Sequence, residues 1–99
     1  MTVKNIEPRD AARQAEAGEL QLVDIRLAPD AAADRIELAS NIPLPELNGR
    51  IGELDSSRPV AFMCRAGAKS QDATRLAAER GFDALNVAGG AIAWREQLG

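Results

Sequence analysis

The chain has 99 residues, of which 45% are hydrophobic and 27% charged, and its formal net charge is -3. This length allows one hydrophobic core, so we expect a single domain over residues 1–99. The acidic balance argues against nucleic acid as a partner, because phosphate binding needs a basic surface. The sequence has no histidine and one cysteine. These counts exclude a Ser-His-Asp triad, a Cys-His dyad, an internal disulfide and a metal site built from thiolates.

The N-terminal residues carry no apolar run after Lys4, so they do not resemble a secretory signal. No stretch of the sequence is long and apolar enough to span a bilayer. A lone thiol without an export signal fits a reducing compartment. We therefore expect a cytoplasmic protein with no membrane partner.

Short helices and strands alternate in the first half of the chain. Proline at an early helical position and Gly18 as a stop favour a helix at the N-terminus. Pro43 and Pro45 exclude a long central strand around them. The elements predicted here are a helix over 8–16, a strand over 20–25, a helical turn over 29–34, and a weak helix over 45–54 that Gly49 and Gly52 interrupt.

The second half is clearer, because apolar runs are separated by glycines. We predict a buried strand over 60–63, a loop over 64–69, a helix that Ser70 caps and Gly81 ends, a strand over 84–87, and a final helix over 91–98. Strands that alternate with helices in this way favour an α/β fold, with a mostly parallel sheet and helices on both faces.

Cys64 follows the buried strand, at the edge of the sheet where such folds bind their ligands. A following helix N-terminus offers unpaired N–H groups, and Gly67 permits a tight curl of the loop around the sulfur. Arg65 and Lys69 add positive charge close by. These three effects favour the thiolate, so we predict a lowered pKa for Cys64.

The local charge supports an anionic substrate. Residues 64–80 carry four basic and two acidic side chains, while the rest of the chain has a net charge of -5. A small cationic site on an anionic body suits a small anion better than a polyanion. The absence of histidine favours chemistry in which a preformed thiolate attacks a soft sulfur, because that attack needs no general base.

Four segments in order along the chain resemble the rhodanese-like sulfurtransferases. They are Leu-Val-Asp-Ile-Arg at 22–26, Ala-Ser-Asn-Ile-Pro-Leu at 39–44, Cys-Arg-Ala-Gly-Ala-Lys-Ser at 64–70, and Ala-Gly-Gly-Ala-Ile-Ala-Trp at 88–94. The resemblance implies a rhodanese-like parallel α/β domain, a persulfide intermediate on Cys64, and neither metal nor cofactor. It also implies thiosulfate-like anions or persulfides as donors and cyanide or thiols as acceptors, with a protein as another candidate donor or acceptor.

The expected site is the loop itself. Cys64 would be the nucleophile, and the substrate-binding residues would be those that follow it: Arg65, Ala66, Gly67, Ala68, Lys69 and Ser70. Their backbone N–H groups would surround the persulfide, and the two cations would attract the donor.

The sequence departs from the family pattern at Arg35, Glu37 and Leu38, so the shape expected for the neighbouring loop does not carry over from the family. Lys69 stands where the family commonly has arginine, so charge is kept while bidentate geometry is lost. Phosphatases of this fold use a longer loop with arginine six positions after the cysteine. Ser70 holds that position here, which counts against phosphoryl transfer.

Two alternatives remain beside sulfur transfer by an enzyme. The domain could be a non-enzymatic sulfur carrier or docking module, with the departures at residues 35–38 as its partner surface. It could also be a thiol phosphatase or an arsenate-type reductase, against which the loop length argues. Asp24 and Arg26 have two interpretations, of which a strand-end pair holding the loops is favoured over a role at the cysteine. Trp94 is expected in the core.

Overall fold

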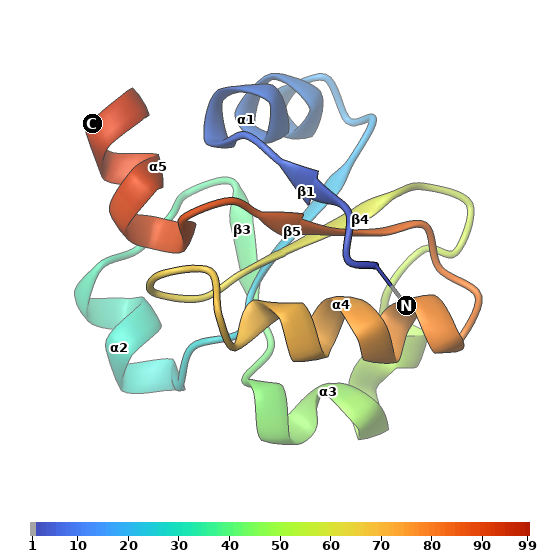
Figure 1. Cartoon of the computed structure of the whole chain (residues 1–99). Helices are drawn as coiled ribbons and strands as arrows, with labels where there is room; N and C mark the ends of the chain where they lie inside the picture. The colour runs from blue at the N-terminus through green and yellow to red at the C-terminus, as the bar shows by residue number, and fades with distance from the viewer. Residues whose placement is uncertain (1) are drawn as a thin grey trace.

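The computed structural model describes residues 2–99, which form a five-stranded parallel sheet in the order β1-β5-β4-β2-β3 (Figure 1). The predicted α/β fold is confirmed. The strands are β1 (Asn5–Ile6), β2 (Gln21–Asp24), β3 (Ala39–Asn41), β4 (Val60–Met63) and β5 (Ala84–Val87). The helices are α1 (Pro8–Glu16), α2 (Ala28–Ala33), α3 (Leu44–Arg50), α4 (Ser70–Glu79) and α5 (Gly90–Leu98), with a 3-10 turn at Ile51–Glu53.

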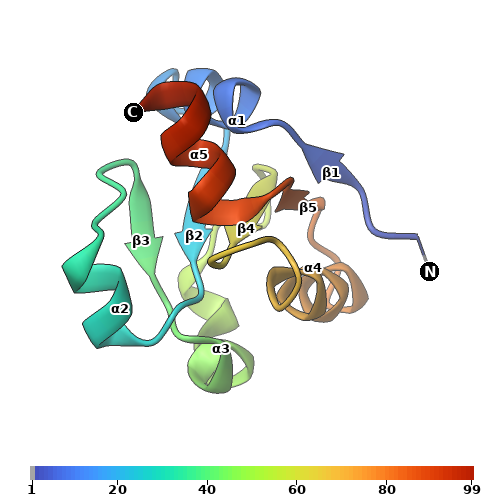
Figure 2. The same ribbon diagram turned by 60° about the vertical axis from the view of Figure 1, so that its left-hand side comes forward.

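Helices cover both faces of the sheet, as Figures 1 and 2 show: α1 and α5 pack on one face, and α3 and α4 on the other. The central strand β4 contributes to both cores, because successive side chains point to opposite faces. Val60 and Phe62 join the cluster under α3 and α4, whereas Ala61 and Met63 join the cluster under α1 and α5. This two-sided burial explains why β4 is a continuous apolar run.

Four local differences separate the structure from the sequence-based prediction. The three-residue edge strand β3 was not predicted, because Pro43 and Pro45 argued against a long strand in this region. The two-residue strand β1 pairs with β5 and was not predicted, because two residues carry no periodicity. Gly49 lies inside α3 and does not interrupt it. Helix α4 has Lys69 at its N-cap and Ser70 as its first residue, so the predicted cap at Ser70 is wrong.

The C-terminal helix closes one core. Trp94 is 5% exposed and packs with the cluster under α1 and α5, as expected for one of the few large side chains of the sequence. Across residues 2–99, none of the helices has both the length and the apolar character needed to cross a bilayer.

Candidate active site

The loop after β4 is anchored to the start of α5. The Cys64 carbonyl accepts a hydrogen bond from the Ala91 N–H at 2.8 Å, and the Arg65 carbonyl accepts one from the Ile92 N–H at 3.0 Å. Gly90, in the left-handed region at φ +59°, allows this close approach. The loop that carries the cysteine is therefore fixed at its first two residues by a helix from the far end of the chain.

The loop curls around the sulfur. Cys64 is 5% exposed, and its Sγ accepts a hydrogen bond from the Gly67 N–H at 3.1 Å. Gly67 has φ +93°, the conformation that glycine was expected to supply. From Arg65 to Ser70, no backbone N–H donates to a backbone carbonyl of the described chain. Three of these donors, the N–H groups of Ala66, Gly67 and Ser70, act on the sulfur, as in an anion-binding nest.

Ser70 is the second partner of the sulfur. Its Oγ lies 3.2 Å from Cys64 Sγ, and the side chain is fully buried. The same hydroxyl donates to Asn86 Oδ1 on β5. The hydroxyl that was expected to cap α4 is therefore engaged by the sulfur and by Asn86.

The thiol titrates under two opposing influences. Burial by itself raises the pKa of Cys64, because it penalises the charged form. The hydroxyl and N–H of Ser70, together with the N–H groups of Gly67 and Ala66, lower the pKa by hydrogen bonding to the thiolate. The hydrogen bonds outweigh burial, so the net pKa lies below the ordinary cysteine value, in the predicted direction. The predicted contribution of loop and helix N–H groups is confirmed, whereas the two loop cations are not among the causes.

Arg65 and Lys69 point into solvent with the two alanines of the loop, Ala66 and Ala68. Neither cation forms a salt bridge with any residue that the structure describes. Both are exposed residues of the cysteine loop, where they can attract an anion from solution. Within residues 2–99, no group of three acidic or cysteine side chains is placed to hold a metal ion.

Asp24 and Arg26 hold the neighbouring loop together. Arg26 binds the Asp24 carboxylate through Nε and one terminal nitrogen at 2.8–3.1 Å, and binds Asp34 Oδ2 through the other terminal nitrogen at 3.1 Å. Asn41 adds hydrogen bonds to the carbonyls of both. None of these side chains forms a hydrogen bond with Cys64, which agrees with the strand-end interpretation.

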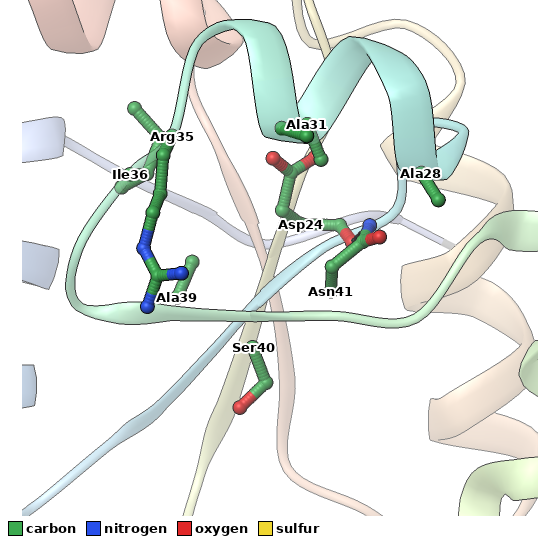
Figure 3. Close-up of a pocket in the computed structure, with 9 residues that line it drawn as sticks. Asp24, Ala28, Ala31, Arg35, Ile36, Ala39, Ser40 and Asn41 are labelled. Atoms are coloured by element: carbon green, nitrogen blue, oxygen red, sulfur yellow. Dashed lines mark hydrogen bonds between the residues drawn. The ribbon is translucent and has the colours of Figure 1, made fainter.

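The residues that depart from the family pattern lie beside a different surface. A depression of about 390 Å³ separates α2 from β3, and Arg35 extends along one side of it (Figure 3). Asp24 and Asn41 lie at its other side, while Cys64 is not among its lining residues. The altered segment therefore reshapes a surface distinct from the cysteine loop.

Comparison with known proteins agrees with this geometry. The sequence matches the rhodanese-like domain family over residues 7–97. The chain belongs to the rhodanese-like domain family. It is 33% identical to the thiosulfate sulfurtransferase GlpE of Shewanella oneidensis, over 94% of this chain and 93% of the relative. A sulfurtransferase of Allochromatium vinosum is 35% identical over 83% of this chain and 78% of its own length.

The fold of this rhodanese-like domain is also found in the human single-domain sulfurtransferase TSTD1. That structure superposes with a TM-score of 0.83 at 25% identity, covering 99% of this chain and all of the other. The coverage shows that the two chains share their fold over nearly their whole length.

Sequence reasoning did not identify Asn86 as part of the site of this rhodanese-like domain. The residue lies 2% exposed in β5, and its amide contacts both Ser70 and the Gly67 carbonyl. A signal was present: an asparagine interrupts an otherwise apolar buried strand, and buried amides need partners. Its partners come from the loop, which lies nearly 20 residues earlier in the sequence, so the pattern did not reveal them.

Replacing Ser70 by alanine is expected to raise the pKa of Cys64, because the thiolate loses a hydrogen-bond donor while burial stays in force. The pH dependence of alkylation by a small neutral reagent measures this. The midpoint of the rate profile should move to higher pH than in the wild type. An unmoved midpoint in a folded variant would show that the hydroxyl does not stabilise the thiolate.

Proposed function

We propose that this chain is a sulfurtransferase that carries a sulfane sulfur on Cys64. The donor is thiosulfate or a persulfide, and the acceptor is cyanide or a thiol. One observation carries this proposal: the Cys64 sulfur is buried inside its loop and accepts a hydrogen bond from the Gly67 N–H at 3.1 Å. Such a loop stabilises an anionic sulfur nucleophile and can stabilise the terminal sulfur of a persulfide in the same way.

In the first half of the reaction, the Cys64 thiolate attacks the outer sulfur of the donor. A new S–S bond forms to Sγ, and the electron pair of the broken bond leaves with the donor's remaining part, which is sulfite when thiosulfate is the donor. The terminal sulfur of the persulfide then carries the negative charge. In this proposal, the terminal sulfur is stabilised by the N–H groups between Arg65 and Ser70, which donate to no backbone carbonyl.

In the second half, the acceptor attacks the terminal sulfur. The S–S bond to Cys64 breaks, and its electron pair returns to Sγ as thiolate. Neither half requires a proton to be taken from the nucleophile, which suits a sequence without histidine. A cytoplasmic location, as expected from the lone thiol, would keep Cys64 reduced between turnovers.

Initial-rate kinetics with thiosulfate and cyanide test the proposal. Because the two substrates react in separate steps, double-reciprocal plots should give parallel lines, with thiocyanate and sulfite as products. Turnover with a low-molecular-weight persulfide but not thiosulfate would retain the mechanism and change the donor. No turnover with any small donor, together with stable binding of a protein partner, would favour the docking or carrier module.

Lys69→Ala is expected to raise the KM for thiosulfate about two- to fivefold, with a much smaller change in kcat, because the ammonium attracts the donor from solution. The effect should shrink as ionic strength rises. Arg9→Ala, which removes one exposed cation from α1, is the matched control and should leave KM unchanged. An equal effect of both substitutions would mean that only net charge matters.

A further inference from the structure

A buried chain of hydrogen bonds runs away from the sulfur. Cys64 Sγ contacts Ser70 Oγ at 3.2 Å, and Ser70 Oγ donates to Asn86 Oδ1. Asn86 Nδ2 in turn donates to the Gly67 carbonyl at 3.2 Å and to Asn5 Oδ1 at 2.9 Å. These hydrogen bonds link the sulfur to the neighbouring strand β5 and, beyond it, to the edge strand β1.

The orientation of the Asn86 amide is fixed by its partners. The Gly67 carbonyl can only accept, so the nitrogen of Asn86 must face it. The amide oxygen then faces Ser70, which has a single hydroxyl proton to give. While this proton lies on Asn86, the lone pairs of Ser70 face the sulfur, an arrangement that suits a neutral Sγ and opposes a thiolate.

We propose that Asn86 is a positioning residue for the reactive thiol, holding the Ser70 hydroxyl proton while Sγ is neutral and releasing it to Sγ when the sulfur becomes anionic. The hydroxyl therefore has two positions. It faces Asn86 in the thiol and in the persulfide, where Sγ carries no charge. It turns to Sγ when the thiolate forms, leaving Asn86 Oδ1 without its donor.

This competition has a measurable consequence. Removing the acceptor at Asn86 leaves the Ser70 hydroxyl with the sulfur as its partner, and the thiolate becomes more stable. The loop should keep its shape, because the Gly67 carbonyl still accepts from Gln71 Nε2 at 3.2 Å. The two carbonyl bonds to α5 are also untouched.

The charged side chains around the sulfur do not account for differences in thiolate stability between the variants compared below. The loop cations Arg65 and Lys69 are exposed, and Asp72 on α4 pairs with Arg75 at 3.2 Å. At the end of β2, Asp24 is paired with Arg26. Within the part of the chain that the structure describes, no ionised side chain forms a hydrogen bond with the sulfur, with Ser70 or with Asn86. The substitutions below change none of these charges.

The test measures the thiolate directly by its ultraviolet absorbance across pH. Asn86→Leu should raise the ratio of thiolate to thiol at a fixed pH by about fivefold, the worth of one hydrogen bond. Ser70→Ala should lower the ratio, and Asn86→Leu should have no effect in the Ser70→Ala background. Asn5→Ala, which removes the last acceptor in this series of hydrogen bonds, is the control and should leave the ratio unchanged.

Two results would overturn the inference: an unchanged or lower ratio in folded Asn86→Leu, or a rise that persists without the Ser70 hydroxyl. If Asn86→Leu does not fold, the ratio of thiolate to thiol is measured in Asn86→Val instead, because strands favour valine. The role of the two Ser70 hydroxyl positions in the reaction cycle rests on the proposed function. The titration of Cys64 does not depend on that function. A wild type that transfers no sulfur yet shows the expected order would refute the function alone, and the reverse result would refute only the inference.

Discussion

Cys64→Ser is expected to abolish sulfur transfer, reducing kcat/KM by about a thousandfold or more, while the fold persists. A serine hydroxyl ionises far above neutral pH and cannot form a persulfide. The smaller side chain can still accept the Gly67 N–H bond that Sγ now accepts. The loop should therefore keep its structure in Cys64→Ser while sulfur transfer is lost.

The assay for Cys64→Ser pairs transfer kinetics with thermal unfolding. The melting temperature should stay within a few degrees of the wild type, because one buried atom changes and no cavity opens. Substantial turnover in the folded variant would remove Cys64 from the mechanism. Loss of transfer together with loss of folding would call for Cys64→Ala, whose methyl group retains the apolar contacts of the site.

Gly90→Ala is expected to destabilise the domain by about 3–5 kcal/mol and to disorder the cysteine loop. A Cβ at Gly90 would lie 2.5 Å from the Cys64 carbonyl oxygen and 2.7 Å from that of Arg65. Both contacts are with backbone, which cannot move without breaking the two hydrogen bonds to α5. The left-handed conformation adds its own cost of about 1–2 kcal/mol for a residue with a side chain.

Gly81→Ala is the matched control for Gly90→Ala. Gly81 has φ +89°, but a Cβ there would meet no atom within 4 Å, so it carries the backbone cost without the clash. Urea unfolding should show a loss of about 1–2 kcal/mol for Gly81→Ala and a clearly larger loss for Gly90→Ala. Equal losses would mean that the contact between α5 and the cysteine loop contributes little to stability.

The parallel α/β pattern and the position of the cysteine followed from local signals. The apolar run of β4 ends at Met63, and Cys64 comes next, so an α/β pattern puts the thiol at the carboxyl edge of the sheet. Gly67 was expected to take a conformation that only glycine adopts readily, and its φ of +93° agrees. Features like these depend on a few neighbouring residues, and the sequence displays them directly.

What the sequence did not reveal depends on long-range contacts. Serine is a preferred N-cap residue, yet the hydroxyl of Ser70 is engaged by Cys64 and by Asn86 on strand β5. The lowered pKa of Cys64 was predicted from N–H groups of the loop and helix together with Arg65 and Lys69. The N–H groups do lower the pKa, the two cations are not among its causes, and the contribution of the Ser70 hydroxyl was not predicted. Sequence proximity gives the charge of a neighbour but not the direction in which its side chain points.

The central claim is that Cys64 carries the transferred sulfur as a persulfide. The most direct test is the intact mass of the purified protein after brief exposure to thiosulfate without reductant, beside Cys64→Ser treated in parallel. We predict a gain of one sulfur atom in the wild type alone, removed on adding cyanide. A wild type that gains no sulfur from thiosulfate or from a low-molecular-weight persulfide, while Cys64 remains open to alkylation, would contradict the claim.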